Sequence, residues 1–89
     1  MTDVTIAVPV TVRFFAAAQH VAGTPAAELM LDPGATIADA IAELCGQSDE
    51  MALLLQKCSY LCDGIAVRDP SVSLRPHQTL DVLPPFAGG

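Results

Sequence analysis

The sequence is poor in basic residues. Its 89 residues include four, Lys57 and three arginines, against ten acidic residues, which gives a formal net charge of −6 at pH 7. Nucleic-acid-binding domains need clustered cations to contact phosphates, and no such cluster is present. Anionic membrane surfaces are poor partners for the same reason. The charge therefore excludes both of these partner classes and is compatible with a basic partner protein.

Cysteine is scarce as well. The three cysteines, Cys45, Cys58 and Cys62, are too few and odd in number for the disulfide framework of a small secreted protein. A plant-type iron–sulfur domain needs four cysteines. The C-x₃-C spacing of Cys58 and Cys62 lacks a second pair of ligands, so it does not indicate a zinc site. We therefore expect no metal site and predict that the thiols pack as small apolar groups.

The chain has neither a long apolar run nor an arrangement of catalytic residues. No stretch approaches the roughly 20 apolar residues of a transmembrane helix. The N-terminus lacks the basic segment of a signal peptide, and Arg13 interrupts the apolar run that follows. His20 and His77 are far apart, with no cysteine–histidine or serine–histidine pair. These absences predict a soluble cytoplasmic protein that binds no cofactor of its own.

What the sequence does contain indicates one domain, because 89 residues can enclose a single modest core. The hydrophobic fraction of 52% argues against disorder and suggests that some apolar surface is kept for a partner.

Residues 4–15 predict a first strand, best defined after Pro9, since proline cannot donate to a strand ladder. Alternation places Phe15 on its polar face with Thr11 and Arg13, which is unusual for a large ring. The opposite face carries Val10, Val12 and Phe14. Residues 16–21 predict a short helical segment closed by Gly23. Residues 26–31 predict a second strand paired with the first.

The clearest helix begins at Thr36, a good N-cap, with Asp39 as an acidic form of the capping box. Apolar residues follow at helical spacing as far as Gly46, which predicts the end of the helix. Ser48 predicts the cap of a shorter helix whose apolar face comprises Met51, Leu54 and Leu55.

The last third of the chain predicts strands at residues 58–62, 65–67 and 79–83, with a turn at Asp63-Gly64. In the final strand, Leu80 and Val82 are expected to face inward and Thr79, Asp81 and Leu83 outward. If this strand neighbours the first, the long crossover between them makes the pair parallel. One main helix across a mixed sheet is an α+β fold of the ubiquitin-like β-grasp type.

The C-terminal segment, residues 84–89, is predicted to form an extended arm that projects from the folded domain. Pro84 and Pro85 favour an extended chain, and Gly88 and Gly89 lack the Cβ that would bar them from a narrow channel. Six extended residues span about 20 Å. We expect the arm, with Phe86 and Ala87 between its prolines and glycines, to carry the Gly89 carboxylate into a partner's active site. The predicted partner-binding patch at its base comprises Phe15, Leu83 and Phe86.

The terminal Pro-Pro-x-x-Gly-Gly motif resembles that of the small, sulfur-carrying subunit of molybdopterin synthase, a MoaD-like family related to the thiamine sulfur carrier ThiS. The resemblance covers nearly the whole chain from about Val10. Two loop positions depart from the family pattern: Asp63 stands where asparagine is common, and His77-Gln78 stand where Gly-Asp often precedes the last strand. Further matching features are Phe14-Phe15-Ala16, the helix at Thr36, Ser48-Asp49 and the turn at Asp63-Gly64.

The resemblance implies a single β-grasp sulfur-carrier domain over residues 1–89. An E1-like partner using ATP would adenylate the Gly89 carboxylate, which is then converted to a thiocarboxylate. The large subunit of molybdopterin synthase would receive it and transfer the sulfur to cyclic pyranopterin monophosphate, so this chain would be a non-catalytic subunit. Two alternatives stay open: a carrier for thiamine, cysteine or tRNA thiolation, and a β-grasp module that uses the tail for isopeptide conjugation or docking.

Overall fold

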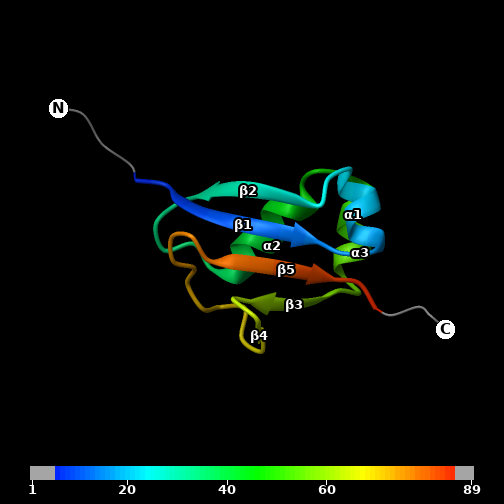
Figure 1. Cartoon of the computed structure of the whole chain (residues 1–89). Coiled ribbons are helices and arrows are strands. Elements are labelled where there is room, and N and C mark those ends of the chain that lie inside the picture. Colours follow the sequence, from blue (N-terminus) through cyan, green and yellow to red (C-terminus); the bar gives the residue numbers. More distant parts are fainter. Residues whose placement is uncertain (1–5, 86–89) are drawn as a thin grey trace.

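The computed structural model describes residues 6–85 of the chain (Figure 1). Every expected helix and strand is present in the expected order. The elements are β1 (Val8–Phe14), α1 (Ala17–Ala22), β2 (Ala26–Leu31), α2 (Ile37–Cys45), α3 (Asp49–Leu55), β3 (Ser59–Cys62), β4 (Ile65–Ala66) and β5 (Thr79–Leu83).

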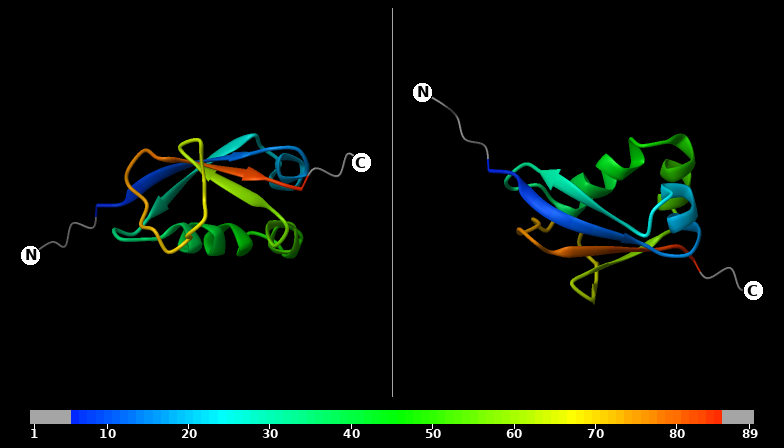
Figure 2. Two further views of the ribbon diagram at one scale, coloured as in Figure 1. Left: turned by 90° about the horizontal axis from the view of Figure 1, so that it is seen from below. Right: turned by 45° about the horizontal axis from the view of Figure 1, so that its top comes forward.

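The five strands form one mixed sheet in the order β2-β1-β5-β3-β4. The first and last strands pair in parallel, as the long crossover predicts, and the other neighbouring pairs are antiparallel. The main helix α2 crosses one face of this sheet, and the opposite face is left open (Figure 2). The fold is therefore α+β with ubiquitin-like β-grasp architecture.

The core lies between the covered face of the sheet and the helices. Leu80 and Val82 of β5 are fully buried there, as alternation predicts, and they pack with Leu44 of α2 and Met51 of α3. The covered face of β1 contributes Val10, Val12 and Phe14. Of the residues expected on the face of the short helix, Leu54 is only half-buried.

Both helix caps are confirmed. Thr36 Oγ1 accepts a hydrogen bond from the Asp39 N–H at 3.1 Å, and the Asp39 carboxylate accepts one from the Thr36 N–H at 2.9 Å. Ser48 Oγ accepts a hydrogen bond from the Met51 N–H at 3.0 Å. Because each bond satisfies an N–H that the first helical turn leaves unpaired, these short sequences determine where α2 and α3 begin.

The bounds of three strands differ from prediction. β1 begins at Val8, before Pro9; the missing N–H is tolerated because β5, its parallel neighbour, starts only at Thr79, opposite Thr11. β3 begins at Ser59, so the expected strand position of Cys58 is wrong. The Cys58 thiol instead donates to the Leu54 carbonyl at 3.3 Å, in the turn that ends α3. β4 ends at Ala66, one residue early.

Candidate functional site

The predicted arm leaves the sheet at the end of β5, beside the end of β1 (Figure 1). Pro84 is half-buried there and Pro85 is exposed. Phe86, Ala87, Gly88 and Gly89 lie outside the described residues, so the reactive carboxylate and the third member of the patch stay predictions. The structure does describe the surface from which the arm departs.

Phe15 and Leu83 lie together on the open face of the sheet. The parallel register pairs Phe14 with Val82, both of which face the core, so the next residue of each chain faces the other way. The Phe15 N–H extends the ladder by donating to the Val82 carbonyl at 3.2 Å. The Phe15 side chain is 38% exposed and Leu83 is half-buried. Their expected adjacency is therefore present, although their role in docking stays a prediction.

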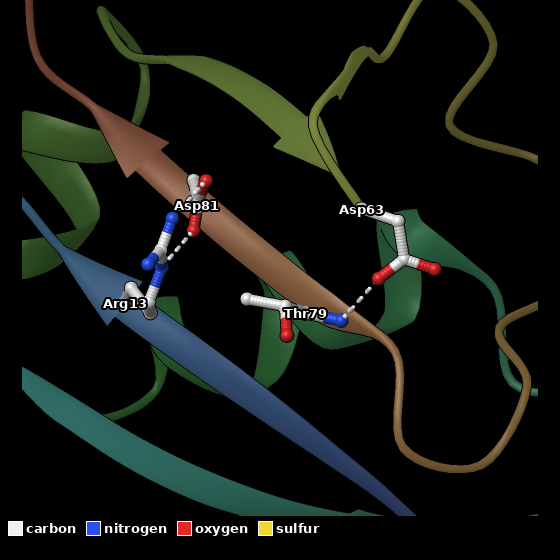
Figure 3. A network of polar contacts seen from close by, with 4 residues as sticks. All are labelled: Arg13, Asp63, Thr79 and Asp81. Atoms are coloured by element: carbon white, nitrogen blue, oxygen red, sulfur yellow. Dashed lines mark hydrogen bonds and ion pairs between the residues drawn. The ribbon is translucent and has the colours of Figure 1, made fainter.

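An ion pair adjoins these two residues, and reasoning from the sequence missed it. The Arg13 guanidinium donates from Nε to Asp81 Oδ1 at 2.6 Å and from Nη2 to Oδ2 at 2.9 Å (Figure 3). Asp81 does face the open side as predicted, yet it is only 5% exposed. The sequence does contain a signal for this ion pair, since Arg13 and Asp81 carry opposite charges on two strands that were expected to be neighbours. The hydrogen bonds and charge of Asp81 raise the pKa of Arg13, which keeps it cationic.

The Arg13 side chain joins the ion pair to the apolar residues, since its Cζ atom lies 5.4 Å from the centroid of the Phe15 ring. Leu61 of β3 stands opposite Asp81 on the same face. We name this surface the tail-base patch: Phe15, Leu61 and Leu83 around the Arg13–Asp81 pair. A partner that covers the tail-base patch would leave no buried charge unpaired, because Arg13 and Asp81 are already joined by two hydrogen bonds.

The chain turns sharply directly after Phe15. Ala16 has φ 51° and ψ −127°, and the Ala18 N–H donates to the Phe15 carbonyl at 3.0 Å. These angles and this bond define a type II′ turn with alanine where glycine is usual. Side chains avoid this backbone conformation, which costs free energy. A strained residue thus stands next to the aromatic member of the tail-base patch.

At the other end of β5, Asp63 ties the β3–β4 turn to the start of the strand. Its backbone N–H donates to the Thr79 carbonyl at 2.8 Å, and its Oδ1 accepts from the Thr79 N–H at 2.8 Å (Figure 3). Its Oδ2 accepts from Gln78 Nε2 at 3.1 Å. The bond from the Thr79 backbone, followed by that from Gln78, lowers the pKa of Asp63.

The two departures from the MoaD-like pattern meet in this contact. Asp63 accepts a hydrogen bond from Gln78, so the two loops in which these positions stand are joined. His77, the residue before Gln78, has a positive φ of 69°.

The remaining candidate residues are not brought together into a site. Cys45, Cys58 and Cys62 are free and half-buried, and burial raises the pKa of Cys58 and of Cys62. His20 and His77 are exposed. Within residues 6–85, no three His, Cys, Asp or Glu side chains are grouped so as to hold a metal ion. None of the helices in this part of the chain has the length and apolarity to cross a membrane.

A family model described as the ThiS family matches residues 12–89, a range that includes the C-terminal glycines. The chain belongs to the ThiS family. With its MoaD relatives, this family comprises β-grasp sulfur carriers and small protein modifiers. No curated protein sequence matches the chain.

Three solved structures illustrate the similarity of this ThiS-family chain to known proteins. The HVO 2177 protein from Haloferax volcanii is 26% identical, with a TM-score of 0.85 over 100% of this chain and 93% of that one. A putative molybdopterin converting factor, subunit 1, from Pyrococcus furiosus is 23% identical, with a TM-score of 0.81 over 89% and 99%. The third comes from a complex of subunits 1 and 2 of molybdopterin-converting factor from Helicobacter pylori 26695, at 18% identity, a TM-score of 0.68 and coverage of 91% and 99%. The second and third likenesses show the shared fold.

Proposed function

We propose that this ThiS-family chain is the small, sulfur-carrying subunit of a molybdopterin synthase. Its Gly89 thiocarboxylate would donate sulfur to cyclic pyranopterin monophosphate. The observation that carries the proposal is the tail-base patch, which lies where the Pro-Pro-Phe-Ala-Gly-Gly segment leaves the sheet. A partner that binds this patch would fix the direction in which the C-terminal segment enters its active site.

The reactive group is the Gly89 carboxylate, which is a poor electrophile as it stands. An E1-like partner joins it to the AMP portion of ATP and releases pyrophosphate, which turns the carboxylate into a mixed anhydride with a good leaving group. A hydrosulfide-level sulfur donor then attacks the acyl carbon. The bond from that carbon to the AMP oxygen breaks, and AMP departs with its electron pair. Loss of the proton on sulfur leaves a terminal thiocarboxylate, with no change of oxidation state. The partners supply the catalytic groups, and this chain supplies the acyl carrier and the surface by which they hold it.

The tail-base patch suits the large synthase subunit as a partner. Phe15 provides an aromatic anchor of the kind that dominates binding energy, and the satisfied Arg13–Asp81 pair can be covered without leaving a lone charge. The Helicobacter pylori complex pairs a chain of this fold with subunit 2 of the converting factor, which supports a large-subunit partner. The net charge of −6 favours a basic surface on that partner.

The chemical part of the proposal is tested by mass spectrometry. The chain is co-expressed with its E1-like enzyme and a sulfur source, and the C-terminal peptide is expected to gain the mass difference between sulfur and oxygen. A variant that lacks Gly89 is the matched control and should stay uncharged. Unmodified carboxylate under conditions that charge a known carrier would refute the sulfur-carrier role. An amide bond from Gly89 to a lysine of another protein would favour the modifier alternative.

The acceptor is tested by calorimetry against the large subunit of molybdopterin synthase. Phe15→Ala and Leu83→Ala should each weaken binding at least tenfold, as buried anchors do, whereas Leu53→Ala, a change of an exposed apolar residue on α3, should have no effect. If all three variants bind the large subunit with the affinity of the unmodified chain, the patch is not the docking surface. A charged chain that fails to bind this subunit would remain a sulfur carrier but would serve another pathway.

A further inference from the structure

A second candidate binding surface lies at the β4 side of the molecule, between the start of α2 and the β3–β4 hairpin. Here a cavity of about 300 Å³ opens to solvent. We call it the β4 groove. Its lining includes four largely apolar side chains and two arginines: Ile37, Cys62, Ile65, Val72, Arg68 and Arg75.

The groove and the tail-base patch lie on different faces of the sheet. Cys62 is paired in register with Leu80, which faces the core, so Cys62 and its β4 partner Ile65 are directed to the side of the helices. The tail-base patch occupies the open side. A ligand in the groove therefore does not compete with a partner on Phe15 and Leu83.

The walls of the groove are held in place by backbone hydrogen bonds. The segment of residues 67–78 passes from the sheet layer to the helix layer (Figure 2). Its carbonyls at Pro70 and Val72 accept the N–H groups of Ala38 and Ile37, at 2.9 and 3.0 Å, and Leu74 anchors it in the core. These bonds satisfy N–H groups that the first turn of α2 leaves unpaired. The groove is therefore formed in advance, which lowers the entropic cost of binding.

Apolar side chains stand exposed around this groove. Ile65 is 72% exposed and Val72 is 53% exposed. They are two of the six large apolar residues that the described part of the chain leaves exposed. Covering them would remove apolar surface from water, which favours a ligand with an aliphatic side chain.

Three charged residues line the groove, and two of them are positive: Arg68 and Arg75 accompany Asp69. Arg68 and Arg75 are two of the four basic residues of the chain, and neither forms an ion pair within residues 6–85. The carboxylates of Asp69 and Asp63 keep their negative charge, because the hydrogen bonds that they accept lower their pKa values. Asp69 Oδ1 accepts the backbone N–H and the hydroxyl of Ser71, and Asp63 accepts hydrogen bonds from Thr79 and Gln78. Since neither carboxylate is bonded to a guanidinium group, Arg68 and Arg75 stay available to an incoming carboxylate.

We propose that the β4 groove is a second docking site, which binds an acidic–aliphatic segment of a partner protein. An aliphatic side chain of that segment would lie against Ile65 and Val72, and its carboxylates would pair with Arg68 and Arg75. The planar guanidinium group suits a carboxylate because it can donate two parallel hydrogen bonds. Repulsion from the acidic residues elsewhere on the chain is largely screened beyond about 8 Å at physiological salt. Within the groove the two arginines outnumber the one carboxylate, that of Asp69.

The placement has a functional consequence that does not depend on the sulfur-carrier proposal. Gln78 lines the groove, and β5 runs from the next residue, Thr79, to Leu83 at the base of the tail. Along the strand, Gln78 in the groove and Leu83 at the base of the tail are five residue steps apart, about 16 Å. Where the two surfaces come nearest, at Leu61 and Cys62, they lie on opposite faces of the sheet. A protein bound at the groove can therefore stay attached while a different protein holds the tail, so that the chain can be passed between partners without being released.

The test is an NMR titration of the full ¹⁵N-labelled chain with a blocked hexapeptide of alternating aspartate and leucine. We expect saturable shifts at the amides of Ile65, Ala66 and Val72, and none at Phe15 or Leu83. The double variant Arg68→Gln/Arg75→Gln should bind at least tenfold more weakly. Val72→Ser, which keeps both charges, should also bind more weakly, and Lys57→Gln, a change of an exposed cation outside the groove, should bind as the unmodified chain does.

The same peptide with lysine in place of aspartate separates charge recognition from apolar adhesion, and it should not bind. Equal binding of the two peptides would overturn the proposal, as would unchanged affinity in the double arginine variant. An absence of saturable shifts in the groove would overturn it too. The exposed positions of both arginines make a folding defect unexpected, and well-dispersed spectra of each variant will verify this.

Discussion

The strained turn at Ala16 provides the sharpest test of the structure. Replacing a residue by glycine usually destabilises a protein, because glycine loses more backbone freedom on folding. At Ala16 we predict the opposite. Its φ of 51° and ψ of −127° are the mirror image of a common extended conformation, which glycine adopts as readily as the ordinary form.

The magnitude follows from two opposing terms. Backbone strain at a non-glycine residue in such a region costs on the order of 1–3 kcal/mol. The additional entropy that glycine loses on folding costs about 0.5–1 kcal/mol. The difference predicts that Ala16→Gly raises the free energy of unfolding by about 1 kcal/mol, which corresponds to an increase of about 4–8 °C in Tm for a domain of this size.

The assay is urea denaturation combined with calorimetry. Ala42→Gly is the matched control, because Ala42 is exposed within α2 and the same chemical change there should destabilise by about 1 kcal/mol. The two identical substitutions are thus expected to have effects of opposite sign. If Ala16→Gly lowers Tm as Ala42→Gly does, the strained turn is absent and the reasoning fails.

The same variant separates stability from binding. The turn holds Phe15 between its ladder bond to Val82 and the hydrogen bond from Ala18. A glycine next to it frees the backbone, so ordering Phe15 against the proposed partner, the large synthase subunit, should cost more free energy. We expect Ala16→Gly to bind about two- to fivefold more weakly although it is more stable. Tighter or equal binding would show that the strain does not serve to position Phe15.

Two further predictions concern titratable groups. The hydrogen bonds from Thr79 and Gln78 lower the pKa of Asp63, so its ionised form stabilises the fold above the ordinary aspartate pKa of about 3.9. This stabilisation is lost as pH falls through the lowered pKa of Asp63. The variant Asp63→Asn should therefore lose less unfolding free energy between about pH 5 and pH 3 than the unmodified chain. Equal losses in urea titrations at the two pH values would contradict the role given to the Asp63 carboxylate. Burial raises the pKa of Cys58 and of Cys62, which leaves less thiolate at neutral pH, so both should react with a disulfide reagent several-fold more slowly in the folded chain than in urea; a rapid burst at either would show an activated thiol.

Much of the fold could be predicted because its signals are local. Thr36 and Ser48 mark the starts of their helices through bonds to residues three positions on, and alternation identifies the buried face of each long strand. The boundary at Cys58 was missed because its thiol bonds to the preceding helix, a contact that strand propensity does not include. Local rules therefore predict the elements better than their ends.

The surfaces were harder to predict because they combine distant residues. Arg13 and Asp81 are 68 positions apart, and only the parallel register places them side by side. The β4 groove joins α2, β3, β4 and the long segment before β5, whose path no periodicity describes. Ala16 stands in an alanine-rich stretch that favours a helix, so nothing in its identity indicates a positive φ. Positions of this kind are where local rules fail and function is found.

The placement of β5 between β1 and β3 has a consequence for how the protein is made. Ribosomal synthesis at about 5–20 residues per second takes several seconds to reach residue 79, and until then the nascent chain lacks its middle strand. Until β5 is made, the strand pairs β2-β1 and β3-β4 each expose an unpaired edge, and such edges favour aggregation. A ribosome that stalls early leaves a chain with neither a finished core nor the segment beyond Leu83. Completion of the sheet and emergence of the C-terminal segment are thus coupled, because the strand that closes the sheet runs directly into that segment.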